Sequence, residues 1–72
     1  MTAAEIRAMC ETIREADKRA YQMADEANEK AETSGSLQEQ NKWLAVWNRI
    51  SDVSLYLENA ADELDAIEKT IQ

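Results

Sequence analysis

The chain has no histidine, no proline and no phenylalanine, and it has one glycine and one cysteine among its 72 residues. Without histidine, the common zinc sites, a His-based catalytic triad and a haem held by imidazole are excluded. With so little glycine and proline, the chain has little room for strand-connecting turns or for a Gly-rich phosphate loop. The single cysteine has no partner within the chain, which indicates a reducing compartment, and we expect a cytoplasmic protein.

Basic residues are also scarce, because eight Lys and Arg stand against 15 Asp and Glu, for a formal net charge of -7. The chain therefore lacks the basic face that nucleic-acid binders present to phosphates. Its acidic surface would also be repelled by anionic lipid headgroups. The longest apolar run is Leu44 to Trp47, whereas a bilayer span takes about 20 apolar residues. We expect neither a direct nucleic-acid partner nor a membrane.

Two capping boxes mark the starts of two helices. Thr2 with Glu5 forms T-x-x-E, and Ser36 with Glu39 forms S-x-x-E, the pattern in which each side chain caps a backbone N–H of the other residue. Gly35 suits the left-handed position that follows the end of a helix. The sequence predicts a single domain with one helix over about 3–33, a turn at 34–36 and a second helix over about 37–70.

Apolar residues recur at heptad spacing through both predicted helices. In the first helix one line contains Ile6, Ile13, Ala20 and Ala27, and a second contains Met9, Ala16 and Met23, with Cys10, Ala24 and Ala31 beside them. In the second helix the lines are Trp43, Ile50, Leu57, Leu64 and Ile71, and Val46, Val53, Ala60 and Ile67, flanked by Trp47 and Ala61. Such seams predict coiled-coil packing, and the short turn predicts an all-α, antiparallel two-helix hairpin.

The second helix carries more apolar surface than one partner helix can cover. Its apolar positions span about 200° or more, whereas a helix packed on a single core shows a stripe of about 100°. The outer edge of this arc consists of Leu37, Leu44 and Leu55, beyond Trp47. We expect these four residues to lie in an oligomer interface, most simply that of a homodimer forming a four-helix bundle. The alternative is that Lys, Arg and Gln stems cover the edge in a monomer.

The residues that carry chemistry are poorly placed for catalysis. A ladder of carboxylates at Glu26, Glu29 and Glu32 lacks the histidines of a di-iron bundle and the glycine of a calcium loop, so a solvated acidic face explains it better. Cys10 lies on an apolar line and is interpreted as a small core residue. A two-helix hairpin offers no buried pocket that would separate the pKa values of two carboxylates. We expect no enzyme, no cofactor and no metal site.

Negative charge is unevenly distributed along the chain. Residues 25–41 and residues 58–72 each carry five acids and one base, whereas residues 1–24 carry four of each. In an antiparallel hairpin these acidic segments would lie at the two ends of the rod, available to a protein partner with a basic surface. The candidate partner-binding residues are Asp25, Glu26, Glu29 and Glu32 at the turn end, and Asp62, Glu63, Asp65 and Glu68 at the tail end.

Three functions agree with this pattern. The first is a small acidic inhibitor, similar in size and charge to those that phages encode, which docks on the basic, nucleic-acid-binding surface of its target; no family motif accompanies this analogy. The second is a structural or adaptor bundle that binds partners through an apolar groove. The third is a small-molecule sensor formed between protomers, which would need convergent polar groups in the interface.

Overall fold

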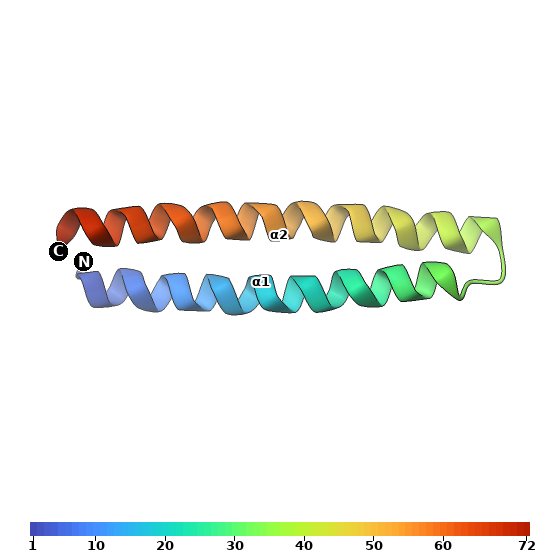
Figure 1. Ribbon diagram of the computed structural model, residues 1–72, viewed down its shortest axis with the longest axis horizontal. Helices are drawn as coiled ribbons and strands as arrows, with labels where there is room; N and C mark the ends of the chain where they lie inside the picture. Colours follow the sequence, from blue (N-terminus) through green and yellow to red (C-terminus); the bar gives the residue numbers. More distant parts are fainter.

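The computed structural model describes all 72 residues and contains two long helices joined by a short turn (Figure 1). Helix α1 runs from Ala3 to Glu32 and helix α2 from Leu37 to Ile71. They lie side by side and antiparallel, so that the two termini meet at one end of a rod (Figure 1). The Cα atoms extend over 54 × 13 × 13 Å. The predicted all-α helical hairpin is confirmed.

Each helix begins with one of the two hydrogen bonds that its capping box predicts, the one that the Thr or Ser hydroxyl accepts. The hydroxyl of Thr2 accepts a hydrogen bond from the backbone N–H of Glu5 at 3.1 Å. The hydroxyl of Ser36 accepts one from the N–H of Glu39, also at 3.1 Å. Each hydroxyl satisfies a first-turn N–H that has no partner within its helix. The capping serine and threonine therefore set where the helices start.

The turn closes in a different way from the one predicted. No residue has a positive φ, so Gly35 is not left-handed. Instead, the backbone N–H and the hydroxyl of Thr33 both donate to the carbonyl of Glu29, each at 3.0 Å. The hydroxyl of Ser34 donates to the carbonyl of Ala31 at 2.8 Å. These hydroxyls satisfy the last carbonyls of α1, and the left-handed glycine that usually does so is not needed.

The two helices meet along a seam of small side chains. On α1 the buried members are Ile6, Cys10, Ala20, Ala24, Ala27 and Ala31, and the half-buried Ile13 and Asp17 continue the three- and four-residue spacing between Cys10 and Ala20. On α2 the buried members are Ser54 and Ala61, with Trp43, Ile50, Leu57 and Leu64 half-buried beside them. Small residues allow close packing, and in the half nearer the turn the alanines of α1 face the larger residues of α2.

The prediction of which apolar line forms the second half of the seam was wrong for α1 and only partly right for α2, where Val46 and Ala60 are half-buried. Met9 and Met23 of α1, and Val53 and Ile67 of α2, are exposed. Their places in the seam are taken by the neighbouring line that includes Cys10 and Ala61. On α1 the physical reason is size, because the line of Cys10, Ala24 and Ala31 permits a closer approach of the helices than the line of Met9 and Met23.

The hairpin has a thin core. No large side chain is fully buried, and the accessible surface is 5342 Å². A globular monomer of 8.2 kDa has an accessible surface of about 4,500 Å², so the rod exposes more than its mass requires. Neither helix combines the length and the apolar character needed to cross a membrane. Most side chains of the rod therefore lie at its surface and are available for contacts with other molecules.

Candidate interaction surfaces

A polar pair interrupts the seam near its middle. The hydroxyl of Ser54 donates to the carboxylate of Asp17 at 2.5 Å, and Ser54 is the one buried polar residue of the chain. A buried polar pair of this kind fixes the register of two helices, because a slipped register would leave both groups unpaired. The Asp17–Ser54 pair divides the rod into two parts. The terminal half consists of residues 1–17 and 54–72, and the turn half consists of residues 18–53.

A cluster around Cys10 joins the helices in the terminal half. The Cys10 thiol donates to the Asp65 carboxylate at 3.3 Å and to the Ala61 carbonyl at 3.5 Å. Arg14 pairs with the other oxygen of Asp65 at 2.5 Å. Burial, followed by the neighbouring Asp65, raises the pKa of the Cys10 thiol. The thiol is therefore protonated at neutral pH, and the predicted core role suits it better than that of a nucleophile.

The same cluster changes the ionisation of its charged members. The hydrogen bond from Cys10, with that from Arg14, lowers the pKa of the Asp65 carboxyl. The hydrogen bond to Asp65 raises the pKa of Arg14. Both shifts favour the ion pair. Sequence reasoning missed this cluster. The antiparallel pairing of the helices could have indicated it, because in such a hairpin the numbers of facing residues add up to a nearly constant value, and for the pairs of this cluster the sums lie between 71 and 79.

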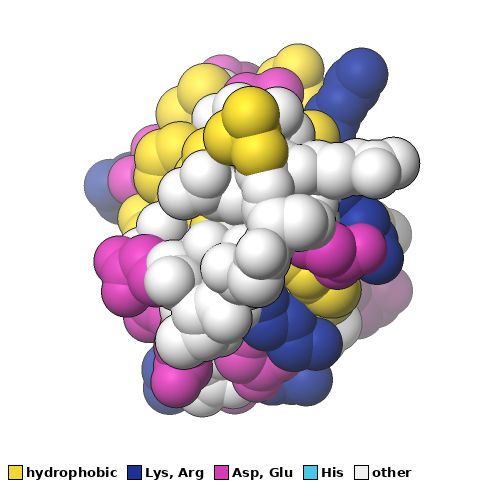
Figure 2. Space-filling model, turned by 90° about the vertical axis from the view of Figure 1, so that its right-hand side faces the viewer, with side chains coloured by type: hydrophobic (Ala, Val, Ile, Leu, Met, Phe, Trp, Pro, Cys, Tyr) yellow, Lys and Arg dark blue, Asp and Glu magenta, His cyan; other side chains and the backbone are white.

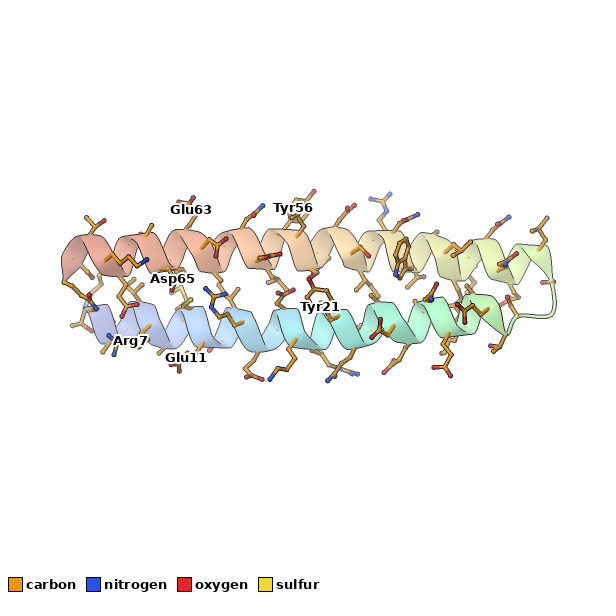
Figure 3. All side chains as sticks on the ribbon, in the orientation of Figure 1. Arg7, Glu11, Tyr21, Tyr56, Glu63 and Asp65 are labelled. Carbon is orange, nitrogen blue, oxygen red and sulfur yellow. The ribbon has the colours of Figure 1, made fainter.

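The acidic residues predicted at the tail end are partly engaged within the hairpin. Glu68 pairs with Arg7 at 2.6 Å, and Asp65 pairs with Arg14. Asp62 lies 3.8 Å from the same guanidinium. Glu63 has no ion pair and points outward from α2 (Figure 3). The four residues therefore divide into three that face arginines and one that is fully available to a partner.

The acidic residues predicted at the turn end are more exposed. Glu26 lies 3.6 Å from Arg19, and Glu32 accepts a hydrogen bond from Asn28 at 3.3 Å. Asp25 and Glu29, at the exposed side of α1, have neither an ion pair nor a side-chain hydrogen bond.

Folding places most of the net charge in one half of the rod. The terminal half carries nine acids and three bases, whereas the turn half carries six acids and five bases. The net charges of the two halves are -6 and -1. The turn half is nearly neutral because Lys18, Arg19 and Arg49 lie near the middle of the rod, whereas residues 25–41 at its end keep the expected five acids and one base. The acidic side chains form no group of three or more that could hold a metal ion.

The four residues predicted for an oligomer interface form an exposed surface, which we call the α2 edge: Leu37, Leu44, Trp47 and Leu55. Leu37 is 71% exposed, Leu55 53% and Trp47 39%. Figure 2, which looks onto the turn end, shows hydrophobic side chains gathered over α2 in its upper part. Beside Leu55 lies an open hollow of about 250 Å³, to which Tyr21 and Glu58 contribute. The aliphatic stems of Lys, Arg and Gln side chains therefore do not cover this edge.

A second apolar surface lies on the other side of the hairpin, and we call it the outer stripe. It consists of the line that was predicted for the core, namely Met9, Ala16 and Met23 of α1 and Val46, Val53, Ala60 and Ile67 of α2. Met23 and Val46 line one groove between the helices. Residues seven apart lie on the same side of a helix, because seven residues make nearly two full turns. The buried Ala20 and Ala27 of the seam show this spacing, and the residues of the outer stripe share it.

At the turn end of this groove, two lysine side chains lie over the ring of Trp43. The ammonium of Lys30 lies 4.5 Å, and that of Lys42 5.0 Å, from the centroid of the Trp43 ring. Cations at this distance are attracted by the negative face of the ring. Trp43 is half-buried, in agreement with its predicted place in the core. Its two cation contacts place positive charge at the turn end of the outer stripe, where Glu26 and Glu39 partly offset it.

Fold and surfaces together define a class of protein: an antiparallel, coiled-coil-like helical hairpin with apolar surface on both sides of a thin core. Comparison with protein-family models, with curated proteins and with solved structures found no match.

Proposed function

We propose that this protein is a non-catalytic interaction protein that binds a helix of a protein partner through the α2 edge. The supporting observation is the exposure of Trp47 together with three leucines along one side of α2. Contiguous apolar surface of this kind marks interaction sites in soluble proteins, and Trp is among the residues that contribute most to binding. The hollow beside Leu55 adds a recess that a partner side chain can fill.

The mode of binding follows from the geometry of a helical edge. Leu37 and Leu44 are two turns apart, and Trp47 follows within one further turn. An amphipathic helix presents its own apolar residues at the same intervals, so it can lie along such an edge. This proposal corresponds to the adaptor hypothesis of the sequence analysis. The arginine contacts of the tail-end acids weigh against the acidic inhibitor, because they engage part of the charge on which it would depend.

One observation favours acidic docking as a second candidate, which is the net charge of -6 in the terminal half. Glu63, which points outward from α2 (Figure 3), and Asp62, which lies 3.8 Å from Arg14 and is 67% exposed, are the acids best placed for it. Rim charges of this kind raise the association rate and make binding depend on salt. A partner of this type would carry a basic surface.

A capture experiment distinguishes the two candidates. The immobilised wild-type protein and two variants are exposed to native lysate at about 50 mM and about 500 mM NaCl, since high salt screens exposed charges. One variant carries Trp47→Ala with Leu44→Glu, and the other Asp62→Lys with Glu63→Lys. The proposal predicts a partner that survives high salt and is lost only with the first variant. A partner lost at high salt, and lost with the second variant alone, would establish acidic docking instead.

A further inference from the structure

The sequence contains three apolar lines on each helix, and the hairpin uses only two of them. The seam takes the lines of Ala20 and Ala24 on α1, and those of Leu57 and Ala61 on α2. The third line on each helix forms the outer stripe. Because the two outer lines fall on the same side of the hairpin, they make one continuous surface. We infer that a second copy of this chain packs on the outer stripe, with its turn at the opposite end of the rod.

The dimensions of the outer stripe fit a stable dimer. From the level of Ile67 to the level of Val46 it covers 21 residues of α2, a length of about 32 Å at 1.5 Å per residue. Two helices of about 10 Å each give it a width of about 20 Å, so two copies would bury about 1,300 Å² in total. Specific interfaces bury about 1,200–2,000 Å².

The charges along the rim of the stripe decide the orientation. Toward the turn the rim contains Arg19, Lys42 and Arg49. Arg19 pairs with Glu26 and Lys42 with Glu39, which leaves Arg49 as the unpaired base. At the terminal end it contains Glu5 and Glu63. A two-fold axis across the rod brings the nearly neutral turn half of one copy, with its unpaired Arg49, against the acidic terminal half of the other. An axis along the rod would bring like ends together, and the two halves of net charge -6 would repel each other.

A specific pair of residues satisfies this arrangement. Arg49 and Glu63 have no ion pair within the hairpin, although both occupy the rim on α2. They lie seven residues on either side of Tyr56. An axis that passes beside Tyr56 therefore places Glu63 of each copy next to the partner's Arg49, twice per dimer.

The proposed two-fold axis of the dimer passes beside Tyr56. This residue is 68% exposed, and its side chain points outward from α2 (Figure 3). In the proposed dimer the two Tyr56 side chains lie beside each other, while Val53 of one copy meets Ala60 of the partner. The α2 edge lies on the opposite side of the hairpin and stays free for a different chain. The inference is thus independent of the proposed partner-binding function.

Sedimentation equilibrium at high micromolar concentration gives the first test. The wild-type mass should be twice the chain mass of 8.2 kDa. Met23→Glu with Val53→Glu should halve it, while far-UV circular dichroism verifies that helix remains. The matched control, Leu44→Glu with Leu55→Glu on the α2 edge, should stay dimeric. A monomeric wild type, or a dimer broken by the control and not by the outer-stripe variant, would overturn the inference.

Charge exchange and crosslinking test the orientation without disturbing the apolar surface. Glu63→Arg and Arg49→Glu should each weaken the dimer several-fold, and the two together should restore it. In a Cys10→Ala background, a short bismaleimide should link Tyr56→Cys to itself and leave Lys42→Cys unlinked. Absence of the Tyr56 crosslink in a dimeric sample, or no rescue by the double exchange, would contradict the head-to-tail arrangement.

Discussion

In the terminal half, Arg7 and Arg14 of α1 reach across to carboxylates of α2, whereas in the turn half no ion pair joins the two helices. There, alanines of α1 face Trp43 and Ile50, and the polar link between helices is the contact of Lys30 with the Trp43 ring. One end of the rod thus depends on charge and pH, and the other on close apolar packing. A seam of uniform spacing is thus held together by two different kinds of interaction.

The largest expected effect comes from overpacking the turn half. Ala27 is 3% exposed in the seam, so Ala27→Leu should lower the free energy of unfolding by about 1–3 kcal/mol. Thermal unfolding followed by circular dichroism measures this loss. Ala45→Leu, at an exposed position of the same half, is the matched control and should change little. Equal behaviour of the two variants would mean that close packing does not hold the turn half together.

A smaller effect is expected at the boundary between the halves. Asp17→Ala removes the acceptor of the Ser54 hydroxyl, and a lost hydrogen bond of a buried group costs about 1 kcal/mol. The urea midpoint should fall accordingly. Asp52→Ala, which removes an exposed and unpaired carboxylate, provides the comparison. If both substitutions shift the midpoint alike, the Asp17–Ser54 pair does not fix the register.

The smallest effect concerns pH and should be confined to the terminal half. Folding lowers the pKa of Asp65 below its ordinary value of 3.8, so the ionised carboxylate stabilises the fold above that pH. Its contribution is lost as the pH falls through the lowered pKa. Asp65→Asn should therefore have a lower melting temperature than wild type at pH 7, and the gap should close near pH 2. A gap that persists in acid would contradict the ionic role of Asp65.

The sequence was sufficient to predict the two helices, the residues at which they begin and their antiparallel arrangement. Thr2 and Ser36 carry a local capping signal that tertiary packing does not override. The closing of α1 was less predictable, because Thr33 and Ser34 compete with Gly35 for the same carbonyls. Nothing in the residue order shows which of them satisfies those groups.

The choice between neighbouring apolar lines could not be made from hydrophobicity alone. Met9 and Cys10 are both apolar and adjacent, so either line completes a seam with Ile6 and Ile13. Side-chain size decides the choice, and the available signal was the recurrence of small residues at seven-residue intervals, in Ala24 and Ala31. The acidic surface was misjudged for a related reason, since pairing across the hairpin brings Arg7 and Arg14 to the tail-end acids.

The central claim is that a hairpin with so thin a core is incomplete alone and is stabilised by association through its exposed apolar surface. The most direct test is the melting temperature of the wild-type protein over a hundredfold range of concentration. Because a dimer unfolds to separate chains, dilution from about 100 µM to about 1 µM should lower the melting temperature by about 10 °C. A melting temperature that does not change with concentration would show that the hairpin is stable as a monomer, and would contradict the claim.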